Sequence, residues 1–526
     1  MVRNLSVRHM MIVRSADRCH MGILMNDLEK AQSCITQVTQ QEPYLTGEKV
    51  IIAVLDSGID YFLPEFRSAD GKTRILAIWD QTQQPDVEQG RIPPPGYREG
   101  VLYTREMINE ALALGRGSGQ RLVPVFDVSG HGTAVAGVAA GTGMGVAPGA
   151  DLLIIKLGSP QADSFPRTTQ LMRGINYAVN LGVELGSPVA VNLSFGNTYG
   201  DHQGNSLLER FVDNASEIGR SAIVVGSGNE GASRGHTAGV LRDASRVVEL
   251  SVADRETGLS IQLWKFYQDV FNLAVISPGG ERMTLELSNI GEAQAVRRTL
   301  ERTELLCYLG RPLPYSVQQE IFIDMIPVGS YLNGGVWRIE LSPVSLVTGE
   351  YRFYLPGYAV RNVATGFFLP TPEMTITIPS TARRAVTVGA YDVPRRSYAD
   401  FSGRGFVYSY SDGRTDTAGG QQIIADVKPD LTAPGVGITV PMPNGGYEQV
   451  SGTSFATPFV TGAAALLMEW GIVRGNDRFL YGERLKASLI RGAQPLAGIP
   501  GRPDSRIGWG TLCVQRALGG IGQSGS

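Results

Sequence analysis

Short apolar runs alternate with helical patterns from about residue 46 onward. Each run is continuously apolar, which is typical of a strand covered on both faces of a sheet. Because strands and helices follow one another in turn, the pattern predicts a parallel sheet with right-handed crossovers. The predicted strands are Val50–Leu55, Leu152–Leu157, Val189–Leu193, Ala222–Val225 and Ala385–Val388.

Helical spacing is visible in two stretches. A long helix rich in small residues is predicted from Thr453 to about Met468. An earlier helix lies between the second and third predicted strands, where apolar residues recur mostly at steps of three and four and mark one face. The residues of that face are Leu171, Ile175, Ala178, Val179 and Gly182.

The pattern changes between roughly residues 240 and 375, where apolar and polar residues alternate with period two. Several short strands without helices between them predict an antiparallel β-sandwich. Turn formers such as Ser277-Pro278-Gly279-Gly280 separate the runs. The runs are Val247–Val252, Ile261–Trp264, Leu273–Ile276, Met283–Leu287, Ile321–Met325, Val336–Leu341 and Tyr351–Leu355.

The fold class predicted from these patterns is α/β, with a parallel sheet flanked by helices and an inserted antiparallel β-sandwich. The division has four parts. Residues 1–33 form an irregular N-terminal segment, 34–239 the first part of the α/β domain, 240–375 the inserted domain and 376–526 the second part of the α/β domain.

Composition narrows the classes of partner. The 526 residues are 43% hydrophobic and 18% charged, with a net charge of −3, so we expect a folded protein without the cationic field of a nucleic-acid binder. No apolar run approaches the roughly 18 residues of a membrane span. The apolar runs near the N-terminus, Met10–Val13 and Gly22–Met25, are shorter than a signal-peptide core of about 7–15 residues. We therefore expect no membrane partner and no secretion by that route.

The cysteines Cys19, Cys34, Cys307 and Cys513 are widely spaced and contain no CxxC pair. This spacing predicts reduced thiols in a reducing compartment, and it offers no zinc site.

Four of the five histidines receive no role. His202 and His236 stand in polar, glycine-rich stretches, where we expect surface or loop positions, and His9 and His20 belong to the irregular N-terminal segment.

Three segments carry candidate chemistry. Asp56 ends the first predicted strand, at the edge where open α/β sheets place their sites. His131 opens an Ala/Gly-rich helical stretch, and Ser454 opens the long helix. Singly, each has a simple structural explanation as a turn or cap residue. Together they supply what serine acyl transfer needs: a hydroxyl, an imidazole base with a suitable pKa, and a carboxylate that orients the imidazole.

The motifs Asp56-Ser57-Gly58, His131-Gly132-Thr133 and Gly452-Thr453-Ser454-Phe455-Ala456-Thr457-Pro458 resemble those of subtilisin-type serine proteases, and their chain order is that of subtilisin. The resemblance implies a subtilisin-like fold and a protein or peptide substrate. It also implies that Asp56 orients His131, that His131 acts as general base and then acid, and that Ser454 is the nucleophile.

The resemblance extends to further site segments. Asn229, in Val225-Gly226-Ser227-Gly228-Asn229-Glu230, matches the family's oxyanion donor, whose loss costs about 10²–10³ in kcat in subtilisin itself. Ser194-Phe195-Gly196 matches the segment that lines the S1 pocket and pairs with the substrate. We assign Ser194, Phe195, Gly196, Gly226, Ser227 and Gly228 to substrate binding.

The inserted β region and an extra segment between Asp56 and His131 resemble the Csp-type germination subtilases. That group carries an inserted jelly-roll domain and activates the zymogen of a spore-cortex hydrolase by limited proteolysis, which implies a cytoplasmic or spore-associated protein. No organic cofactor is implied. Subtilisins often bind calcium, but no D-x-D-x-D-G loop is present, and we assign no metal ligand.

Two other functions compete with a serine protease. A catalytically silent pseudoprotease would act as a binding or signalling scaffold, yet all three triad residues and Asn229 are present. An α/β-hydrolase esterase would need G-x-S-x-G and the order Ser, Asp, His, which this chain lacks.

The N-terminal segment is too short for the usual subtilase pro-domain. Three explanations stay open at this point: folding without one, a pro-domain supplied separately, or a start at Met21 or Met25.

Overall fold

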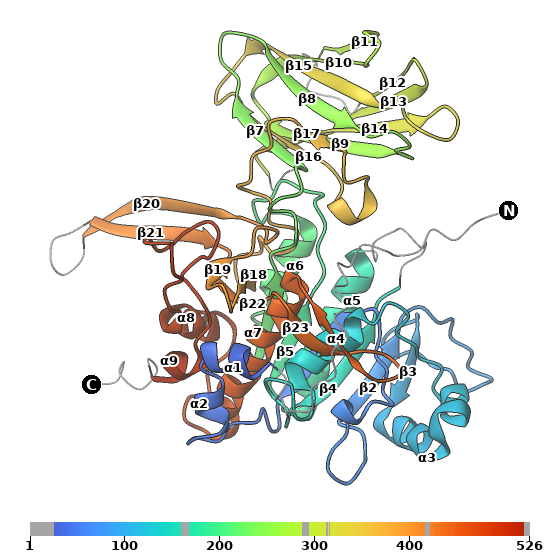
Figure 1. Ribbon diagram of the computed structural model, residues 1–526, viewed down its shortest axis with the longest axis vertical. Coiled ribbons are helices and arrows are strands. Elements are labelled where there is room, and N and C mark those ends of the chain that lie inside the picture. The colour runs from blue at the N-terminus through green and yellow to red at the C-terminus, as the bar shows by residue number, and fades with distance from the viewer. Residues whose placement is uncertain are drawn as a thin grey trace.

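A mixed sheet of nine described strands forms the centre of the α/β part (Figure 1). The computed structural model describes residues 26–158, 168–286, 294–311, 314, 316–415 and 421–519. Along the sheet the strand order is β19-β18-β6-β5-β1-β4-β2-β3, and β22 pairs with β18. The pairs from β2 to β18 are parallel, whereas β3 and β19 are antiparallel edge strands.

Continuous apolar runs form these strands because both faces of the sheet are covered. In β1 (Ile51–Asp56), Ile52 and Val54 enter one hydrophobic core while Ile51, Ala53 and Leu55 enter the other. Helices α4 and α7 lie in the first core, and α5 and α6 lie in the second. The predicted α/β class is therefore confirmed.

The elements of the α/β part follow in chain order. They are α1 (Asp27–Gln32), α2 (Thr36–Thr39), β1, η1 (Pro64–Phe66), β2 (Ile75–Asp80), β3 (Val101–Thr104), α3 (Arg105–Leu122), α4 (His131–Ala140), β4 (Asp151–Lys156), α5 (Thr168–Leu185), β5 (Val189–Leu193), α6 (Leu207–Ala215), β6 (Ser221–Gly226), β18 (Val386–Asp392), β19 (Ser397–Tyr398), β20 (Phe406–Thr415), β21 (Gln421–Lys428), β22 (Leu431–Pro434), β23 (Ile438–Pro441), β24 (Tyr447–Val450), α7 (Thr453–Met468), η3 (Glu469–Val473), α8 (Gly482–Gly492) and α9 (Val514–Gly519).

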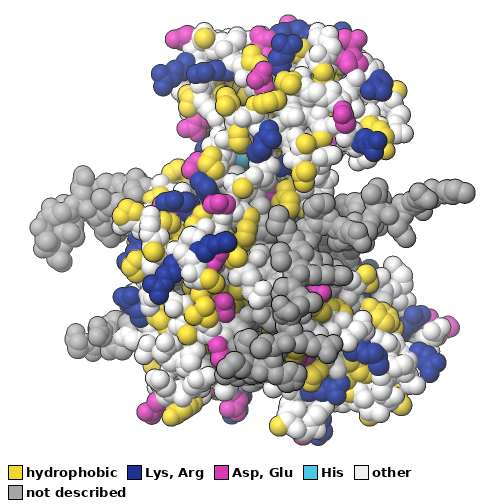
Figure 2. Space-filling model, viewed as in Figure 1, with side chains coloured by type: hydrophobic (Ala, Val, Ile, Leu, Met, Phe, Trp, Pro, Cys, Tyr) yellow, Lys and Arg dark blue, Asp and Glu magenta, His cyan; other side chains and the backbone are white. Residues whose placement is uncertain are grey.

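Two antiparallel sheets form a separate layer pair above the α/β part in Figure 1. Their strand orders are β11-β10-β15-β8-β17 and β12-β13-β14-β9-β16-β7. One apolar core contains residues of both sheets, as in a sandwich. On the face shown in Figure 2, basic and acidic side chains are interspersed over these sheets.

The two inserted sheets contain more strands than the sequence predicted. All seven predicted runs overlap strands, although Leu287, the last residue of the run from Met283, lies outside the described residues. Strands β7, β12, β13 and β17 were not predicted. The strands are β7 (His236–Val240), β8 (Arg246–Val252), β9 (Leu259–Phe266), β10 (Val270–Ile276), β11 (Arg282–Leu285), β12 (Gln294–Leu300), β13 (Thr303–Leu309), β14 (Gln318–Pro327), β15 (Gly335–Ser345), β16 (Glu350–Tyr354) and β17 (Gly366–Phe367), and η2 (Tyr358–Val360) lies between β16 and β17.

The prediction of reduced thiols is wrong for Cys34 and Cys513, which form a disulfide. Cys34 lies between α1 and α2, and Cys513 directly precedes α9. The backbones of these two segments are also in contact, since Val514 N donates to Ser33 O over 3.0 Å. Tertiary folding brings the two thiols together across 479 positions, so local spacing carries no signal of the bond. Cys307 is a buried free thiol, and Cys19 lies outside the described residues.

The expectation of surface or loop histidines is also wrong in part. His202, in the loop after β5, and His236, at the start of β7, are 1% and 2% exposed. Both rings stack on Tyr354 of β16, at the junction of the α/β part and the inserted sheets. Their polar, glycine-rich neighbourhoods are turns of this junction and not open surface.

One helical stretch is longer and more apolar than was expected of any segment in this chain. Thr453–Val473 is long and apolar enough to cross a bilayer by length and composition alone. However, 83% of its apolar window is buried inside the protein, and a core helix passes the same test.

Candidate active site

The carboxylate of Asp56 and the ring of His131 meet at the carboxyl end of β1. Asp56 Oδ1 lies 2.7 Å from His131 Nδ1 and accepts a second hydrogen bond from Ser57 N, also over 2.7 Å. The Asp56 side chain is 6% exposed and that of His131 28%. The carboxylate is thus enclosed, whereas the imidazole keeps one side accessible.

Gly132 allows this approach of helix α4 to strand β1. A Cβ atom at Gly132 would stand 2.3 Å from Gly58 O and 3.2 Å from the Cβ of Asp56. Any larger residue would push the helix, and with it His131, away from the strand.

Asp127 organises the loop that leads into α4. Its Oδ1 accepts from Ser57 Oγ at 2.8 Å and Gly130 N at 3.0 Å, and its Oδ2 accepts from Thr133 N at 2.8 Å. A carboxylate at this place caps free amides of the first helical turn. Asp127, four residues before His131, was not among the residues predicted to take part in the site.

The protonation of His131 is set by opposing effects. Burial lowers the pKa of its imidazole, but the charge of Asp56, the hydrogen bond to Asp56 and the charge of Asp127 outweigh it. The net effect raises the pKa above its ordinary value of 6.5. The site therefore favours the imidazolium that forms when the ring takes a proton.

Ser454 stands in the first turn of α7, whose predicted bounds match those observed. The ring of Phe455, the next residue, lies 5.6 Å from the His131 ring between centroids. Ser454 Oγ donates to Ser194 O over 3.3 Å, and among the described hydrogen bonds none joins it to His131. Catalytic hydrogen bonds are often loose without substrate, and rotation about χ1 redirects a serine hydroxyl.

Ser194 connects the end of β5 to the start of α7. Its Oγ accepts from Asn192 Nδ2 at 2.9 Å and donates to Ser454 O at 2.8 Å. Asn192 Oδ1 in turn accepts from Thr461 Oγ1 at 2.9 Å. This buried chain of hydrogen bonds fixes the helix start relative to the sheet edge.

Asn229 follows β6 and faces the same helix start. Its Oδ1 accepts from Thr453 N at 3.0 Å and from Thr453 Oγ1 at 3.1 Å. Because a backbone N–H can only donate, these bonds fix which end of the amide is oxygen. The Nδ2 end lies beside Gly452, where a Cβ atom would be 3.4 Å from it.

The glycines assigned to substrate binding are required by packing within the protein. A Cβ at Gly196 or Gly228 would stand 2.3 or 2.4 Å from Thr377 side-chain atoms, and one at Gly226 would be 2.8 Å from Thr457 Oγ1. Ser227 is fully buried, and its amide donates to Val388 O over 2.9 Å. Phe195 is partly buried against the second core. Their roles toward substrate remain predictions.

Comparison with known proteins places this arrangement in a family. The profile of the Subtilase family matches residues 47–254 and 370–510, which carry Asp56, His131, Asn229 and Ser454. The chain belongs to the Subtilase family. The unmatched residues between the two segments contain most of the antiparallel sheets.

This subtilase resembles several characterised proteins. The CspB protease of Clostridium perfringens is 33% identical, with a TM-score of 0.81, and the match covers 93% of this chain and 96% of that one. The PI-type proteinase of Lactococcus lactis subsp. cremoris is 25% identical, over 84% of this chain and 24% of that protein. The minor extracellular protease Vpr of Bacillus subtilis is 23% identical, over 90% and 52%. The chain thus spans about a quarter of the length of the Lactococcus relative and about half of Vpr.

A polar cavity of about 680 Å³ opens beside the site of this subtilase. The register pairs Asp56 with Lys156 and Lys156 with Asp80, so about 10 Å separates Asp56 from Asp80 along the sheet edge. The charged side chains that line the cavity form two ion pairs, Asp86 with Arg91 and Asp80 with Lys156. The lining residues are Asp80, Thr82, Gln83, Gln84, Pro85, Asp86, Arg91, Pro124, Phe126 and Lys156.

No metal ligands are assigned. Within the described ranges, no three His, Cys, Asp or Glu side chains gather closely enough to hold a metal ion. Calcium binding therefore has no support from a side-chain cluster in this part of the chain.

Proposed function

We propose that this subtilase is a serine endopeptidase that hydrolyses peptide bonds through an acyl-enzyme on Ser454. The observation that carries the proposal is the 2.7 Å contact of Asp56 Oδ1 with His131 Nδ1, directly beside the first turn of α7. Membership of the Subtilase family supports it.

In the first step, Ser454 Oγ turns from Ser194 O toward His131 Nε2 and attacks the carbonyl carbon of the scissile bond. The imidazole takes the hydroxyl proton as the O–C bond forms. Because Asp56 is bound to Nδ1, it fixes the tautomer with Nε2 free and stabilises the imidazolium.

In the second step, the imidazolium gives its proton to the leaving amine as the C–N bond breaks. The acyl group stays on Ser454 Oγ. A water molecule, deprotonated by the same imidazole, then attacks the ester and regenerates the hydroxyl.

Negative charge on the former carbonyl oxygen needs donors. Asn229 Nδ2 and the backbone N–H of Ser454 supply them in this proposal. Residues in the first turn of a helix have N–H groups without intrahelical acceptors, and the helix dipole adds to their effect.

Substrate recognition in this proposal uses Ser194, Phe195 and Gly196, which follow β5 at the carboxyl ends of the parallel strands. In the proposal, an extended peptide pairs with the backbone of this segment as an added strand. The polar cavity beside Asp56 is suited to a polar substrate side chain, because its own charges are already paired.

The finer role that we propose is limited proteolysis of a zymogen during spore germination. Its support is the inserted β-sandwich together with the likeness to the CspB protease, which spans nearly both chains. A test is incubation of the protein with the pro-form of a spore-cortex hydrolase. A single new N-terminus on that substrate is expected, and absence of cleavage by an enzyme active on peptides would contradict this role.

A fluorophosphonate probe tests the endopeptidase itself. The wild-type protein should be labelled at Ser454 and should cleave a fluorogenic peptide, and Ser454→Ala should abolish both while the folded circular dichroism spectrum is kept. Ser451→Ala is the matched control, because Ser451 is exposed and, among the described residues, its Oγ accepts from Gly437 N alone. Folded wild-type protein that resists labelling would instead favour a catalytically silent scaffold.

A further inference from the structure

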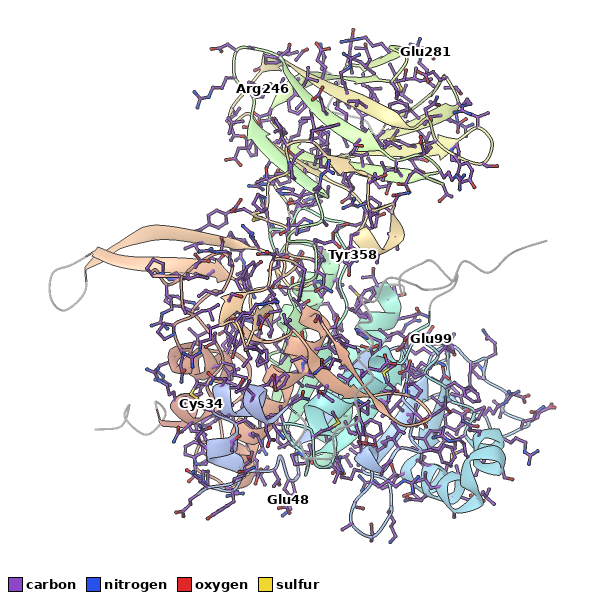
Figure 3. The ribbon with its side chains drawn as sticks, viewed as in Figure 1. Cys34, Glu48, Glu99, Arg246, Glu281 and Tyr358 are labelled. Atoms are coloured by element: carbon purple, nitrogen blue, oxygen red, sulfur yellow. A yellow bond between two sulfur atoms is a disulfide. The ribbon has the colours of Figure 1, made fainter. Side chains whose placement is uncertain are left out.

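Helix α3 carries an arginine that reaches back toward the end of β1. The helix lies between β3 and α4 in the chain and is broken at Gly115, where φ is 75°. Arg116 directly follows the break, and its side chain is 37% exposed. In Figure 3 the labelled Arg246 and Glu281 lie on the inserted sheets, and α3 lies at the other end of the molecule (Figure 1). The arginine therefore acts within the α/β part, away from the insertion.

The guanidinium of Arg116 binds the carboxylate of Asp60, four residues after Asp56. Its Nη1 donates to Asp60 Oδ1 over 3.1 Å and to Asp60 Oδ2 over 2.9 Å. Its Cζ stands 5.0 Å from the centroid of the Phe62 ring. The Asp60 side chain is 7% exposed, so removal of the arginine would leave an enclosed carboxylate without its cation.

The same carboxylate holds the loop of the β23–β24 hairpin. Asn444 N donates to Asp60 Oδ2 over 2.8 Å, and Asn444 Oδ1 accepts from Arg116 Nη1 over 3.3 Å. Asn444 has a φ of 68°, a left-handed conformation that asparagine adopts more readily than most other residues. Arg116 and Asp60 therefore bind this loop residue at its side chain and at its amide.

The hairpin loop rests on the start of the helix that carries His131. Gly130 is the N-cap of α4, and a Cβ atom there would stand 3.0 Å from Pro443 Cδ and 3.2 Å from Met442 Cε. The loop also leads to the nucleophile, because α7 begins three residues after the end of β24 and holds Ser454 in its first turn. One loop thus touches the helix of the base and precedes the helix of the nucleophile.

A second connection joins Asp60 to α4 directly. Asp60 N donates to Thr133 Oγ1 over 3.0 Å, and Thr133 Oγ1 donates to Asp127 Oδ2 over 2.7 Å. Thr133 and Asp127 are both buried, and Asp127 also accepts from the amide of Gly130. The backbone of Asp60 is therefore bound to the helix start, while its side chain is bound to the loop and to Arg116.

We propose that Arg116 is a positioning residue of the active site, which acts through Asp60 to hold the hairpin loop Met442–Gly446 against the start of α4. This inference rests on the proposed endopeptidase function. His131 and Ser454 stand on two different helices, and proton transfer requires their side chains to meet in one geometry. The loop packs on the first helix and continues into the second, so an arginine that fixes the loop restricts the relative position of base and nucleophile.

The test is Arg116→Gln, which keeps a long side chain and removes the charge. A misplacement of about 1 Å caused far from the chemistry can cost about 10² in rate, and this change acts through an intermediate residue, so we expect kcat to fall about tenfold. KM should change by less than about twofold, because the contacts with substrate are kept. Labelling by the fluorophosphonate counts the competent molecules, and the fall should persist when kcat is expressed per labelled Ser454.

Two further variants separate this role from general destabilisation. Arg116→Lys should keep kcat within about threefold of the wild type, because Nη1 alone makes the three described hydrogen bonds of the guanidinium and an ammonium can replace a single nitrogen. In an Asp60→Asn background, Arg116→Gln should alter kcat by less than about twofold, because the charge through which the arginine acts is already absent.

Arg121→Gln is the matched control. Arg121 is an exposed residue of the same helix, and its described hydrogen bond goes to Ser118 Oγ over 3.2 Å. Its kcat should equal that of the wild type. The inference would be overturned by an unchanged kcat per labelled site in Arg116→Gln, by Arg116→Lys as slow as Arg116→Gln, or by an equal fall with Asp60 already neutralised. Failure of the wild type to react with the fluorophosphonate would overturn the proposed function instead.

Discussion

His202 stacks on Tyr354 with ring centroids 4.0 Å apart and an interplanar angle of 13°. His236 stacks on the same tyrosine at 4.5 Å and 25°. The three rings come from the loop after β5, from β16 and from β7, so they connect the α/β part to the inserted sheets. Both histidines are almost fully buried there, which couples their ionisation to the integrity of this junction.

Acid is expected to weaken the junction. Burial lowers the pKa of His202 to about 4 and that of His236 to about 3; the Arg352 charge adds to this effect on both, and Asp201 opposes it at His202. As pH falls, the two imidazoles of the unfolded chain are protonated at a higher pH than those of the folded protein. The contribution of the neutral rings to stability is therefore complete above pH 6.5 and is lost as pH falls toward their pKa values in the folded state. The loss is about 1.4 kcal/mol per pH unit for each histidine.

His236→Phe tests this prediction by urea unfolding at a series of pH values. Phenylalanine still stacks on Tyr354 but cannot bind a proton, so stability should fall less steeply below pH 6.5 than in the wild type. A constant offset from the lost bond to Thr371 O is expected at every pH. Parallel curves for the two proteins would contradict the assignment.

The pH dependence of peptide hydrolysis should report the raised pKa of His131. The base must be neutral to take the Ser454 proton, so kcat/KM should rise with pH through a midpoint above 6.5 and be lost on the acid side. Asp56→Asn removes the largest raising effect, leaving burial to lower the pKa. It should also lower kcat about 10⁴-fold, the loss found for the triad aspartate of another serine protease.

Because that variant is nearly inactive, the midpoint is best measured on the ring itself. An NMR titration of His131 should show a lower midpoint in Asp56→Asn than in the wild type. Asp86→Asn, which removes a carboxylate paired with Arg91 in the neighbouring cavity, should leave it unchanged. A wild-type midpoint at or below 6.5 would refute the prediction.

Loss of the Cys34–Cys513 bond is expected to destabilise the protein. A disulfide contributes about 2–5 kcal/mol to such folds, chiefly by restricting the unfolded chain. Replacing both cysteines by serine should lower the unfolding free energy by that amount, and a reducing agent should do the same to the wild type. The double variant should be insensitive to the reducing agent; an equal response of both proteins would point to another thiol.

The fold was predictable where one local pattern decides the structure. The helix from Thr453 to Met468 and the first strand, found at Ile51–Asp56, have apolar sequences that suit only fully covered elements. The inserted strand β12 was missed because Arg297 and Arg298 interrupt the apolar pattern. Its partner β13 buries alternate residues at Thr303, Leu305 and Cys307, but the apolar Leu306 between them hides this period of two in the sequence.

The residues of the candidate site and its surroundings also divide into those that a local motif predicts and those that only tertiary contacts reveal. Asp56, His131 and Ser454 are recognisable because each stands in a short motif whose chemistry requires it. The stack of His202 on Tyr354 depends on a contact between residues far apart in the chain, for which a single sequence holds no signal. Asp127 stands just before the motif of His131, and its five hydrogen-bond contacts reveal what it does.

The bond between Cys34 and Cys513 also governs how damage to the chain would be observed. It closes a loop across 479 positions, so a single peptide-bond cut in any surface loop between the two leaves both fragments covalently joined. A nicked molecule would therefore migrate as one band in a non-reducing gel and separate into two only after thiol is added. Autolysis of this protein would pass unnoticed unless the gels are run under both conditions.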